Sequence, residues 1–217
     1  ASGSIISDGA GSFLAAVIDT EKRVAYFGTA GQYGFIVRLN LTTMNVDAQT
    51  FGSSQYSSAI IDTKNQVAYF GSQTTKPGKI DRLNLTTMMI IGSASGITGE
   101  HFFSSAIIDT TNQVGYFGTD TSPAIVVKFN LVTMTRIGSA SGVAGENAFV
   151  SVVIDTTNQL GYFGTFTNPG IVVKFNLATM TRIGNVSGMT GEKYFVSAII
   201  DTTNQLGYFG TDSSSGI

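Results

Sequence analysis

Apolar residues occur along the chain in short runs that are separated by polar turns rich in Thr, Asn and Gly. In residues 103–139, Ser105–Asp109 is a β-branched run, and Val114–Thr119 is a second run that is rich in aromatic residues. Ile125–Leu131 follows with apolar side chains at alternating positions, and Arg136–Ser139 is a shorter fourth run. Alternation with period two is typical of strands, and no window has apolar 3,4-spacing over a helical length. The segment predicts a four-stranded antiparallel meander.

The same pattern recurs along the whole chain of 217 residues. The copies are AAVIDTEKRVAYFGT (15–29), SAIIDTKNQVAYFGS (58–72), SAIIDTTNQVGYFGT (105–119), SVVIDTTNQLGYFGT (151–165) and SAIIDTTNQLGYFGT (197–211). Four strands in a unit of about 46 residues is typical of a β-propeller blade, which stacks on its neighbours because it cannot bury its apolar faces alone. The pattern therefore predicts one all-β propeller domain over residues 1–217.

The predicted blades cover residues 13–52, 56–92, 103–139 and 149–184, with a fifth, composite blade formed by 195–217 together with the N-terminal residues. Ile5–Ser7 aligns with a fourth strand, and Gly216–Ile217 aligns with the opening of a third. Either Ile5–Ser7 closes the ring, or the chain is a piece of a larger ring or array in which a neighbouring chain supplies the absent strand. The start at Ala1 without Met fits a processed form or a fragment.

The repeat resembles those of known propeller families. The pattern I-D-T-x-N-Q-x-x-Y-F-G-T followed by I-V-V-K-F-N-L-x-T-M-T is similar to the YVTN and NHL-type repeats over essentially the whole chain. The chain departs from these families at two turns, where they prefer Asp-Gly and Thr-Gly and this sequence has Thr111–Asn112 and Thr133–Met134. The resemblance implies a propeller fold and does not identify a function, because this fold hosts many unrelated activities.

The charge content limits the classes of partner. Charged residues make up 12% of the chain, compared with about 25% in typical soluble domains, and the formal net charge is −2. Without a run of Lys or Arg, nucleic acid is not an expected partner. No apolar stretch approaches the roughly 18 residues that span a bilayer, so membrane insertion is not expected. The chain has no Cys and therefore no disulfide framework or thiolate metal site.

Three segments match the N-glycosylation acceptor pattern, at Asn40, Asn84 and Asn185. The first two lie in the predicted turn between third and fourth strands, whereas the equivalent turns at Asn130 and Asn176 lack the hydroxyl residue. Together with the Ser/Thr-rich surface, these sites favour an extracellular or cell-surface location. Asn185 is the less favourable acceptor, because strand pairing hides its amide.

Two sets of acidic residues repeat with the units. The aspartates Asp19, Asp62, Asp109, Asp155 and Asp201 each stand where a strand enters a turn, and we interpret them as Asx-turn residues rather than as metal ligands. Glu100, Glu146 and Glu192 each end a Gly-x-x-Gly-Glu loop, and the shorter loop before Asp62 has no equivalent. They could hold a calcium ion. A cap onto backbone amides of the next blade is the favoured interpretation, so we expect no metal site and no cofactor.

The positions expected to line the central channel do not provide an obvious catalytic set. They are Ser57–Ser58, Ser104–Ser105, Val150–Ser151 and Val196–Ser197. Small hydroxyls and Val supply neither metal ligands nor a general base. The one histidine, His101, has no apparent dyad partner. Basic residues recur in the third strand, and we expect their stems to pack on the blade edge: Arg38, Arg82, Lys128 and Lys174.

Three hypotheses for function remain. The favoured one is a glycosylated, non-catalytic extracellular scaffold, such as a filament or surface-layer subunit, whose partners are further copies or other extracellular proteins and glycans. The second is a ligand- or protein-binding propeller that uses top-face residues, namely Glu100, Phe102, Phe103, Glu146, Phe149, Glu192, Tyr194 and Phe195. The third, least favoured, is a metal-dependent hydrolase.

Overall fold

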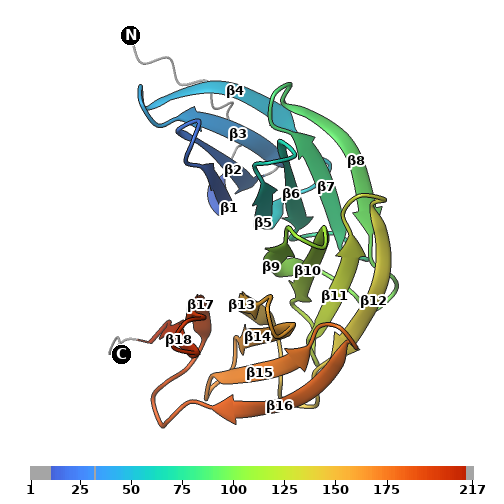
Figure 1. The fold of residues 1–217 in the computed structure, drawn as a ribbon, viewed down its shortest axis with the longest axis vertical. Helices are drawn as coiled ribbons and strands as arrows, with labels where there is room; N and C mark the ends of the chain where they lie inside the picture. Colours follow the sequence, from blue (N-terminus) through green and yellow to red (C-terminus); the bar gives the residue numbers. More distant parts are fainter. Residues whose placement is uncertain (1–10, 32, 214–217) are drawn as a thin grey trace.

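The structure is a computed structural model that describes residues 11–31 and 33–213. Within these residues the chain forms 18 β-strands and no helix, and the strands assemble into five antiparallel sheets. We number the sheets as repeats 1 to 5 in chain order. Figure 1 shows them fanned around one axis as an open arc, with the first strand of each repeat on the inner side of the arc.

Repeats 1 to 4 are four-stranded meanders in which each strand pairs with the next. Repeat 1 contains β1 (Ser12–Asp19), β2 (Val24–Ala30), β3 (Phe35–Asn40) and β4 (Asn45–Phe51). Repeat 2 contains β5 (Tyr56–Asp62), β6 (Val67–Ser72), β7 (Lys79–Asn84) and β8 (Met89–Ser95). Repeat 3 contains β9 (Phe103–Asp109), β10 (Val114–Thr119), β11 (Ile125–Asn130) and β12 (Thr135–Ser141). Repeat 4 contains β13 (Phe149–Asp155), β14 (Leu160–Thr165), β15 (Ile171–Asn176) and β16 (Thr181–Ser187).

Repeat 5 consists of β17 (Phe195–Asp201) and β18 (Leu206–Thr211) in the described part of the chain. The predicted four-stranded antiparallel units are confirmed for repeats 1 to 4. The predicted composite fifth blade depends on the N-terminal residues, and Ile5–Ser7 lies outside the described residues, as does Gly216–Ile217.

The fourth strands of repeats 2 to 4 extend further than the sequence predicts. The expected units ended at residues 92, 139 and 184, whereas β8, β12 and β16 continue to Ser95, Ser141 and Ser187. Their last residues pair with the first residues of the third strands, for example Ser141 with Ile125. In β8 and β12 the added residues are Ser and Ala, which have little intrinsic strand preference, so tertiary pairing rather than local propensity makes them strands.

The first strands of repeats 2 to 5 begin where the predicted blades begin, and each contains a β-bulge near its start. In β9, Phe103 pairs with Thr119 and Ser105 with Gly118, so the register shifts across Ser104. The bulge directs the Phe103 ring into the core, where its centroid lies 5.3 Å from that of Phe117. Equivalent shifts occur at the start of β5, β13 and β17. The bulge is a repeated feature that places one aromatic ring between sheets.

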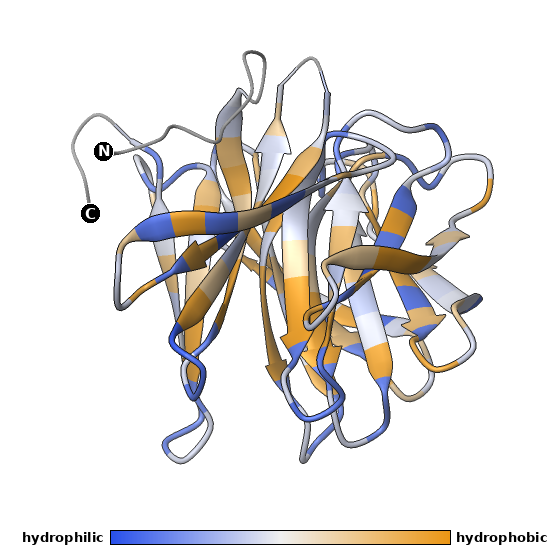
Figure 2. Ribbon diagram, turned by 90° about the horizontal axis from the view of Figure 1, so that it is seen from above, coloured by the Kyte–Doolittle hydropathy of each residue, from blue (hydrophilic) through white to orange (hydrophobic). Residues whose placement is uncertain are grey.

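The core lies between adjacent repeats rather than within one. One cluster joins Tyr69, Ile80 and Ala94 of repeat 2 to Phe103, Phe117, Val127, Phe129 and Leu131 of repeat 3. A second cluster joins the equivalent Tyr116, Val126 and Ala140 of repeat 3 to Phe149, Phe163, Val173, Phe175 and Leu177 of repeat 4. Each repeat thus offers a Tyr–Val face to the following repeat and a Phe-rich face to the preceding one. Figure 2 shows hydrophobic residues in bands along the strands, and many hydrophilic residues in the connecting turns.

Close approach of the repeats explains the glycine of the Tyr-Phe-Gly motif. A Cβ atom on Gly118 would lie 2.4 Å from Ser105 Oγ and 2.8 Å from the Phe149 Cβ of the next repeat. No side chain fits in this space, so glycine is required where the inner strands of successive repeats meet.

The ends of the arc leave equivalent positions exposed. Phe13 in repeat 1 corresponds to the fully buried Phe103, yet it is 46% exposed. In repeat 5, Tyr208 corresponds to Tyr116 and is 57% exposed, compared with 1% for Tyr116. The same faces that are buried between repeats are therefore open at both ends of the described arc.

Replacing a buried inter-repeat ring should be costly. We expect Phe117→Ala to lower the unfolding free energy by about 3–5 kcal/mol, because it leaves a cavity among Phe103, Phe129 and the preceding sheet. Phe209→Ala changes the equivalent, partly exposed residue of repeat 5 and should cost clearly less. Guanidinium unfolding followed by circular dichroism measures both, and equal losses would contradict this packing scheme.

Candidate functional site

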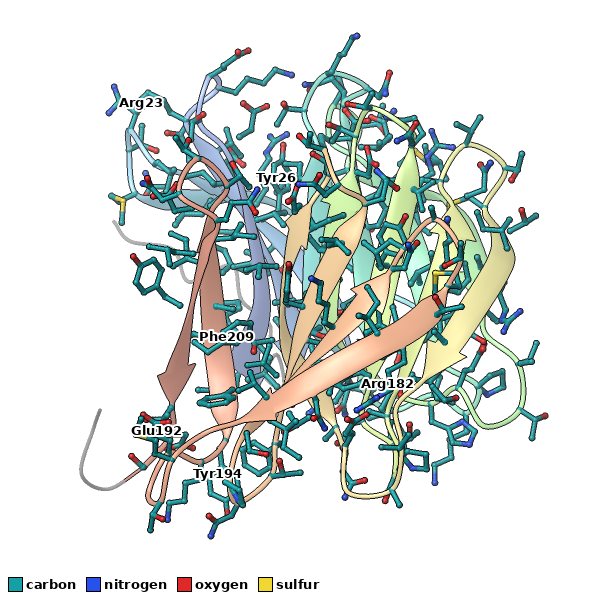
Figure 3. The ribbon with its side chains drawn as sticks, turned by 60° about the horizontal axis from the view of Figure 1, so that its bottom comes forward. Arg23, Tyr26, Arg182, Glu192, Tyr194 and Phe209 are labelled. Atoms are coloured by element: carbon teal, nitrogen blue, oxygen red, sulfur yellow. The ribbon has the colours of Figure 1, made fainter. Side chains whose placement is uncertain are left out.

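The polar residues that repeat along the chain gather at the two ends of the central axis. We call one end the turn end, because it carries the turns that follow each repeated Asp. We call the other end the loop end, because it carries the Gly-x-x-Gly-Glu loops. Figure 3 shows Arg23 at the turn end and Glu192 and Tyr194 at the loop end. Because strands alternate in direction, the turns at Asn40 and Asn84 belong to the turn end.

Two of the three repeated glutamates are buried in charge-paired networks. Glu100 accepts bidentate hydrogen bonds from Arg136, with distances of 2.8 Å to Nε and 2.5 Å to Nη2, and one from the Ile97 amide at 2.9 Å. Glu146 is bound in the same way by Arg182 and by the Val143 amide. Both carboxylates are at most 3% exposed. Each pair joins a loop-end loop to the outer strand of the following repeat, β12 or β16.

The cap that the sequence predicts is therefore present in part. The amides belong to the loop of the glutamate itself and not to the next repeat, which contributes a guanidinium instead. The loop can turn back on its own glutamate because Gly145, at φ +93°, has a left-handed conformation that favours glycine. With their oxygens engaged by arginine, Glu100 and Glu146 are already neutralised, and this arrangement gives no support to the calcium alternative.

The environment of Glu146 changes its ionisation. Burial acts to raise the pKa of this carboxyl, but hydrogen bonds from Arg182, the Val143 amide and Asn185 outweigh burial and lower the pKa below its ordinary value of 4.5. The pKa of Arg182 is raised, chiefly by its hydrogen bonds to Glu146. Both shifts favour the charged pair.

Glu192 lies in the equivalent loop before repeat 5 and has a different environment. Its carboxylate accepts the Met189 amide at 2.7 Å, as its counterparts do. Among the described residues no arginine pairs with it, because β17 and β18 have no outer strand beside them. Glu192 is only partly buried.

The junction between repeats 1 and 2 uses other groups in place of the Glu–Arg pair. Tyr56 takes the position of Phe103, and its hydroxyl donates to Asp81 Oδ2 at 2.5 Å. The same oxygen accepts the Ser53 amide at 3.0 Å, and Lys79 Nζ lies 3.6 Å from Asp81 Oδ1. Burial, followed by the Asp81 charge, raises the pKa of Tyr56. The only sequence signal for this buried pair is an Asp at an apolar position of the third strand.

The repeated aspartates have the turn-forming role that the sequence predicts. Asp109 Oδ1 accepts the Asn112 amide at 3.0 Å, and its Oδ2 accepts the Asn112 side chain at 2.8 Å. For Asp109 the amide is three residues on, whereas Asp201 accepts both the Thr203 amide, at the expected spacing of two residues, and the Asn204 amide. Gln159 of the next repeat also donates to Asp109 at 3.2 Å, as Gln113 does to Asp62 at 2.7 Å. The turns thus link neighbouring repeats. Burial acts to raise the pKa of Asp109, and these hydrogen bonds lower it overall.

Small side chains line the central axis, around a cavity of about 340 Å³. The lining includes the predicted channel positions Ser57–Ser58, Ser104–Ser105, Val150–Ser151 and Val196–Ser197. The hydroxyls of Ser58, Ser105 and Ser151 each donate to the carbonyl of the residue that opens the next repeat, at 2.6 Å. These hydroxyls fasten adjacent inner strands.

Three of the aromatic residues predicted to form a binding face are buried instead. Phe103 and Phe149 are fully buried, and Phe195 is 6% exposed. That expectation was wrong for them, because the bulge at the strand start turns each ring toward the core. Phe102 and Tyr194, one residue earlier, are partly exposed, and Lys76 lies over the Phe102 ring at 5.1 Å.

The loop end also carries exposed residues that the sequence did not single out. Phe166 stacks on Tyr194 with a centroid distance of 4.3 Å and an interplanar angle of 21°. The three Gly-x-x-Gly-Glu loops each present one exposed apolar side chain, at Ile97, Val143 and Met189. The repeated motif marks these three positions in the sequence, but only the structure shows that their side chains are exposed.

Three of the four basic residues of the third strands lie over tyrosine rings, a partner that the sequence analysis did not specify. Lys128 Nζ lies 5.5 Å from the Tyr116 ring centroid and donates to the Leu177 carbonyl of the next repeat at 2.8 Å. Arg82 and Lys174 lie over Tyr69 and Tyr162, and Arg38 instead pairs with Asp47 at 2.7 Å. His101 contacts the Phe102 ring at the loop end.

A glycan is attached to asparagine through Nδ2, and the predicted acceptor asparagines differ in the hydrogen bonding of this atom. Asn40 Oδ1 accepts the amides of Thr42 and Thr43, and Asn84 is bonded likewise, so each amide nitrogen is left out of the turn. Asn185 Nδ2 instead donates to Glu146 at 2.6 Å. Asn130 and Asn176 cap their turns in the same way as Asn40. The turn therefore explains the asparagine, and only the following Thr distinguishes the acceptor sites.

No family model matches this sequence, and no curated protein sequence matches it. Among solved structures, hydrazine synthase of Kuenenia stuttgartiensis is similar, with a TM-score of 0.72 at 10% identity. The match covers 86% of this chain and 52% of that chain, so this protein spans about half the length of its structural neighbour. At this identity the likeness shows the fold alone. The described residues contain no helix of the length and apolarity that a bilayer span requires.

Removing one buried carboxylate tests the charge network. We expect Glu146→Gln to lower the unfolding free energy at neutral pH, by at most about 3–5 kcal/mol, because Arg182 loses its partner. Since the folded pKa of Glu146 is lowered, its contribution is present above pH 4.5 and is lost as the pH falls through the folded value. The variant should therefore lose less stability on acidification than the native chain.

Glu192→Gln is the matched control, because it removes the same charge from a site without an arginine. Urea unfolding at a series of pH values measures all three proteins. If the two variants lose stability equally at neutral pH, the Glu146–Arg182 pair does not hold the repeats together.

Proposed function

We propose that this protein is a non-catalytic, extracellular scaffold built on a β-propeller of the YVTN/NHL type, with glycans on its turn end. The proposal rests on the hydrogen bonds that the repeated polar residues make. The inner-strand serines, the aspartate turns and the buried glutamates each donate to or accept from the neighbouring repeat. The chemistry repeated along the chain joins units, and this use fits a structural role better than a reaction centre.

The division between the two ends supports this proposal. Asn40 and Asn84 occupy equivalent turns of adjacent repeats, with the amide nitrogen outside the turn's hydrogen bonds. Sugars attached there would cover the turn end and add solubility to a surface with only 12% charged residues. The loop end stays free for contact with other molecules. A filament or surface-layer subunit, joined through the open faces of the arc, is the form of scaffold that we favour.

A second candidate function is the binding of a ligand or protein at the loop end. The Phe166–Tyr194 stack and the neighbouring Lys193, 5.7 Å from the Tyr194 ring, favour it. Exposed aromatic pairs of this kind bind sugar rings and aromatic or cationic side chains. Panels of immobilised oligosaccharides probed with the native chain and with Phe166→Ala test it. Met44→Ala, which changes an exposed residue of the turn end, is the control.

Glycan mapping tests the extracellular scaffold. We expect glycopeptides at Asn40 and Asn84 in protein isolated from its native source, because both side chains cap their turns through Oδ1 and leave Nδ2 out of these hydrogen bonds. Asn185 should be unmodified, since its Nδ2 donates to Glu146. Peptide mass spectrometry with and without glycosidase treatment measures the occupancy. Bare asparagine at both turn sites would contradict the extracellular assignment and favour a binding module inside the cell.

A further inference from the structure

The face of repeat 4 that is directed toward repeat 5 is incompletely covered. In repeat 3 the equivalent face, formed by Tyr116, Val126 and Ala140, is packed under five side chains of repeat 4. Those side chains are Phe149 from the first strand, Phe163 from the second, and Val173, Phe175 and Leu177 from the third strand and the turn after it. On repeat 4, the described part of repeat 5 supplies counterparts to Phe149 and Phe163 only, which are Phe195 and Phe209.

A groove remains where the third strand of repeat 5 would pack. It has a volume of about 280 Å³, and its lining includes Tyr162, Val172, Val186 and Phe209. Val186 is 64% exposed, although Ala140 at the equivalent position is 8% exposed. An adjoining hollow continues along Val172, Val186 and Phe209 as far as Glu192 at the loop end. Figure 3 shows Glu192 and Phe209 on this side of repeat 5.

The backbone beside this groove is a strand edge. In repeat 4, β14 pairs on one side with β13 and on the other with β15, from Leu160–Asn176 to Gly164–Val172. In the described residues β18 pairs only with β17. From Leu206 to Gly210 its other edge can accept a strand through backbone hydrogen bonds, while the groove takes alternate side chains.

Glu192 adds a charge requirement at the end of the groove. Where a loop carries this glutamate before a complete repeat, the outer strand of that repeat provides an arginine, in the pairs Glu100–Arg136 and Glu146–Arg182. Where the loop has no glutamate, before repeat 2, the position equivalent to Arg136 is Ile90, which pairs with Leu83 as Arg136 pairs with Phe129. Glutamate and arginine thus occur together within this chain.

We propose that the groove between repeats 4 and 5 binds a β-hairpin with the repeat's own third- and fourth-strand sequence. Its first strand adds to β18 and places Val, Phe and Leu at alternating positions over Tyr162, Val172 and Val186. Its second strand carries an arginine that forms a bidentate ion pair with Glu192. Residues 171–187 of this chain, IVVKFNLATMTRIGNVS, have this pattern and serve as the probe.

Binding of the 171–187 peptide to the full chain tests the proposal by fluorescence anisotropy of the labelled peptide. The peptide should bind at one site, and its Phe175→Ser form should not, because the apolar groove is left unfilled. The peptide with Arg182→Met should bind about tenfold more weakly to the native chain, and Glu192→Gln should reduce affinity for the unmodified peptide to a similar degree. Combining the two changes should cost little more than either alone.

Asp47→Asn is the matched control, since it removes one exposed carboxylate from repeat 1 and should leave peptide affinity unchanged. If the isolated peptide does not form a hairpin, a second measurement still tests the proposal. Residues 172–187 are appended after Ile217, and the thermal midpoint should rise relative to the chain with Phe175→Ser in the appended segment.

Absence of stabilisation by the appended segment, together with absence of peptide binding, would overturn the proposal. Binding that is indifferent to both Arg182→Met and Glu192→Gln would overturn the recognition by charge. Self-association of the unmodified chain that blocks peptide binding, observed by sedimentation, would show that a second copy covers the groove instead.

Discussion

The packing of a phenylalanine-rich face against the tyrosine–valine face of the preceding sheet is the interaction on which the rest of this structure depends. A single meander has two apolar faces and no core of its own, so its strands are stable only between neighbours. This requirement explains the bulge that turns Phe103 inward and the glycine at 118, where no Cβ atom fits between inner strands. It also explains the open apolar faces at both ends of the described arc.

The polar residues follow from the same constraint. When sheets approach closely, the groups at their junctions lose water and need partners from the adjacent repeat. Ser105 finds a backbone carbonyl, Asp62 finds Gln113, and Glu146 finds Arg182. At the junction of repeats 1 and 2, Asp81 accepts hydrogen bonds from Tyr56 of its own repeat and from Ser53 of the connecting loop. Different residue types thus fulfil one requirement, which is satisfaction of polar groups between stacked sheets.

The antiparallel meander also separates the surface into two chemically different ends. Turns after the first and third strands face one way, and the longer connections between repeats face the other. The turn end carries asparagines that cap tight turns through Oδ1, and the loop end carries partly exposed aromatics and one exposed apolar residue per Gly-x-x-Gly-Glu loop. Strand direction therefore assigns sites that lie close in sequence to opposite ends, and it makes the two proposed uses of the surface compatible.

The sequence by itself determined the unit, the strand class and the role of the repeated aspartates, because these depend on local alternation and on turn chemistry that recurs in each copy. Only the tertiary structure decided which side chains are accessible and which are paired. Phe102 and Phe103 are adjacent in sequence, yet a bulge exposes one and buries the other. Glu146 and Arg182 are distant in sequence, and their contact depends on how the outer strand of one repeat passes the preceding loop. Such long-range geometry has no signature in a local pattern, whereas a repeated pattern reveals that stacking occurs.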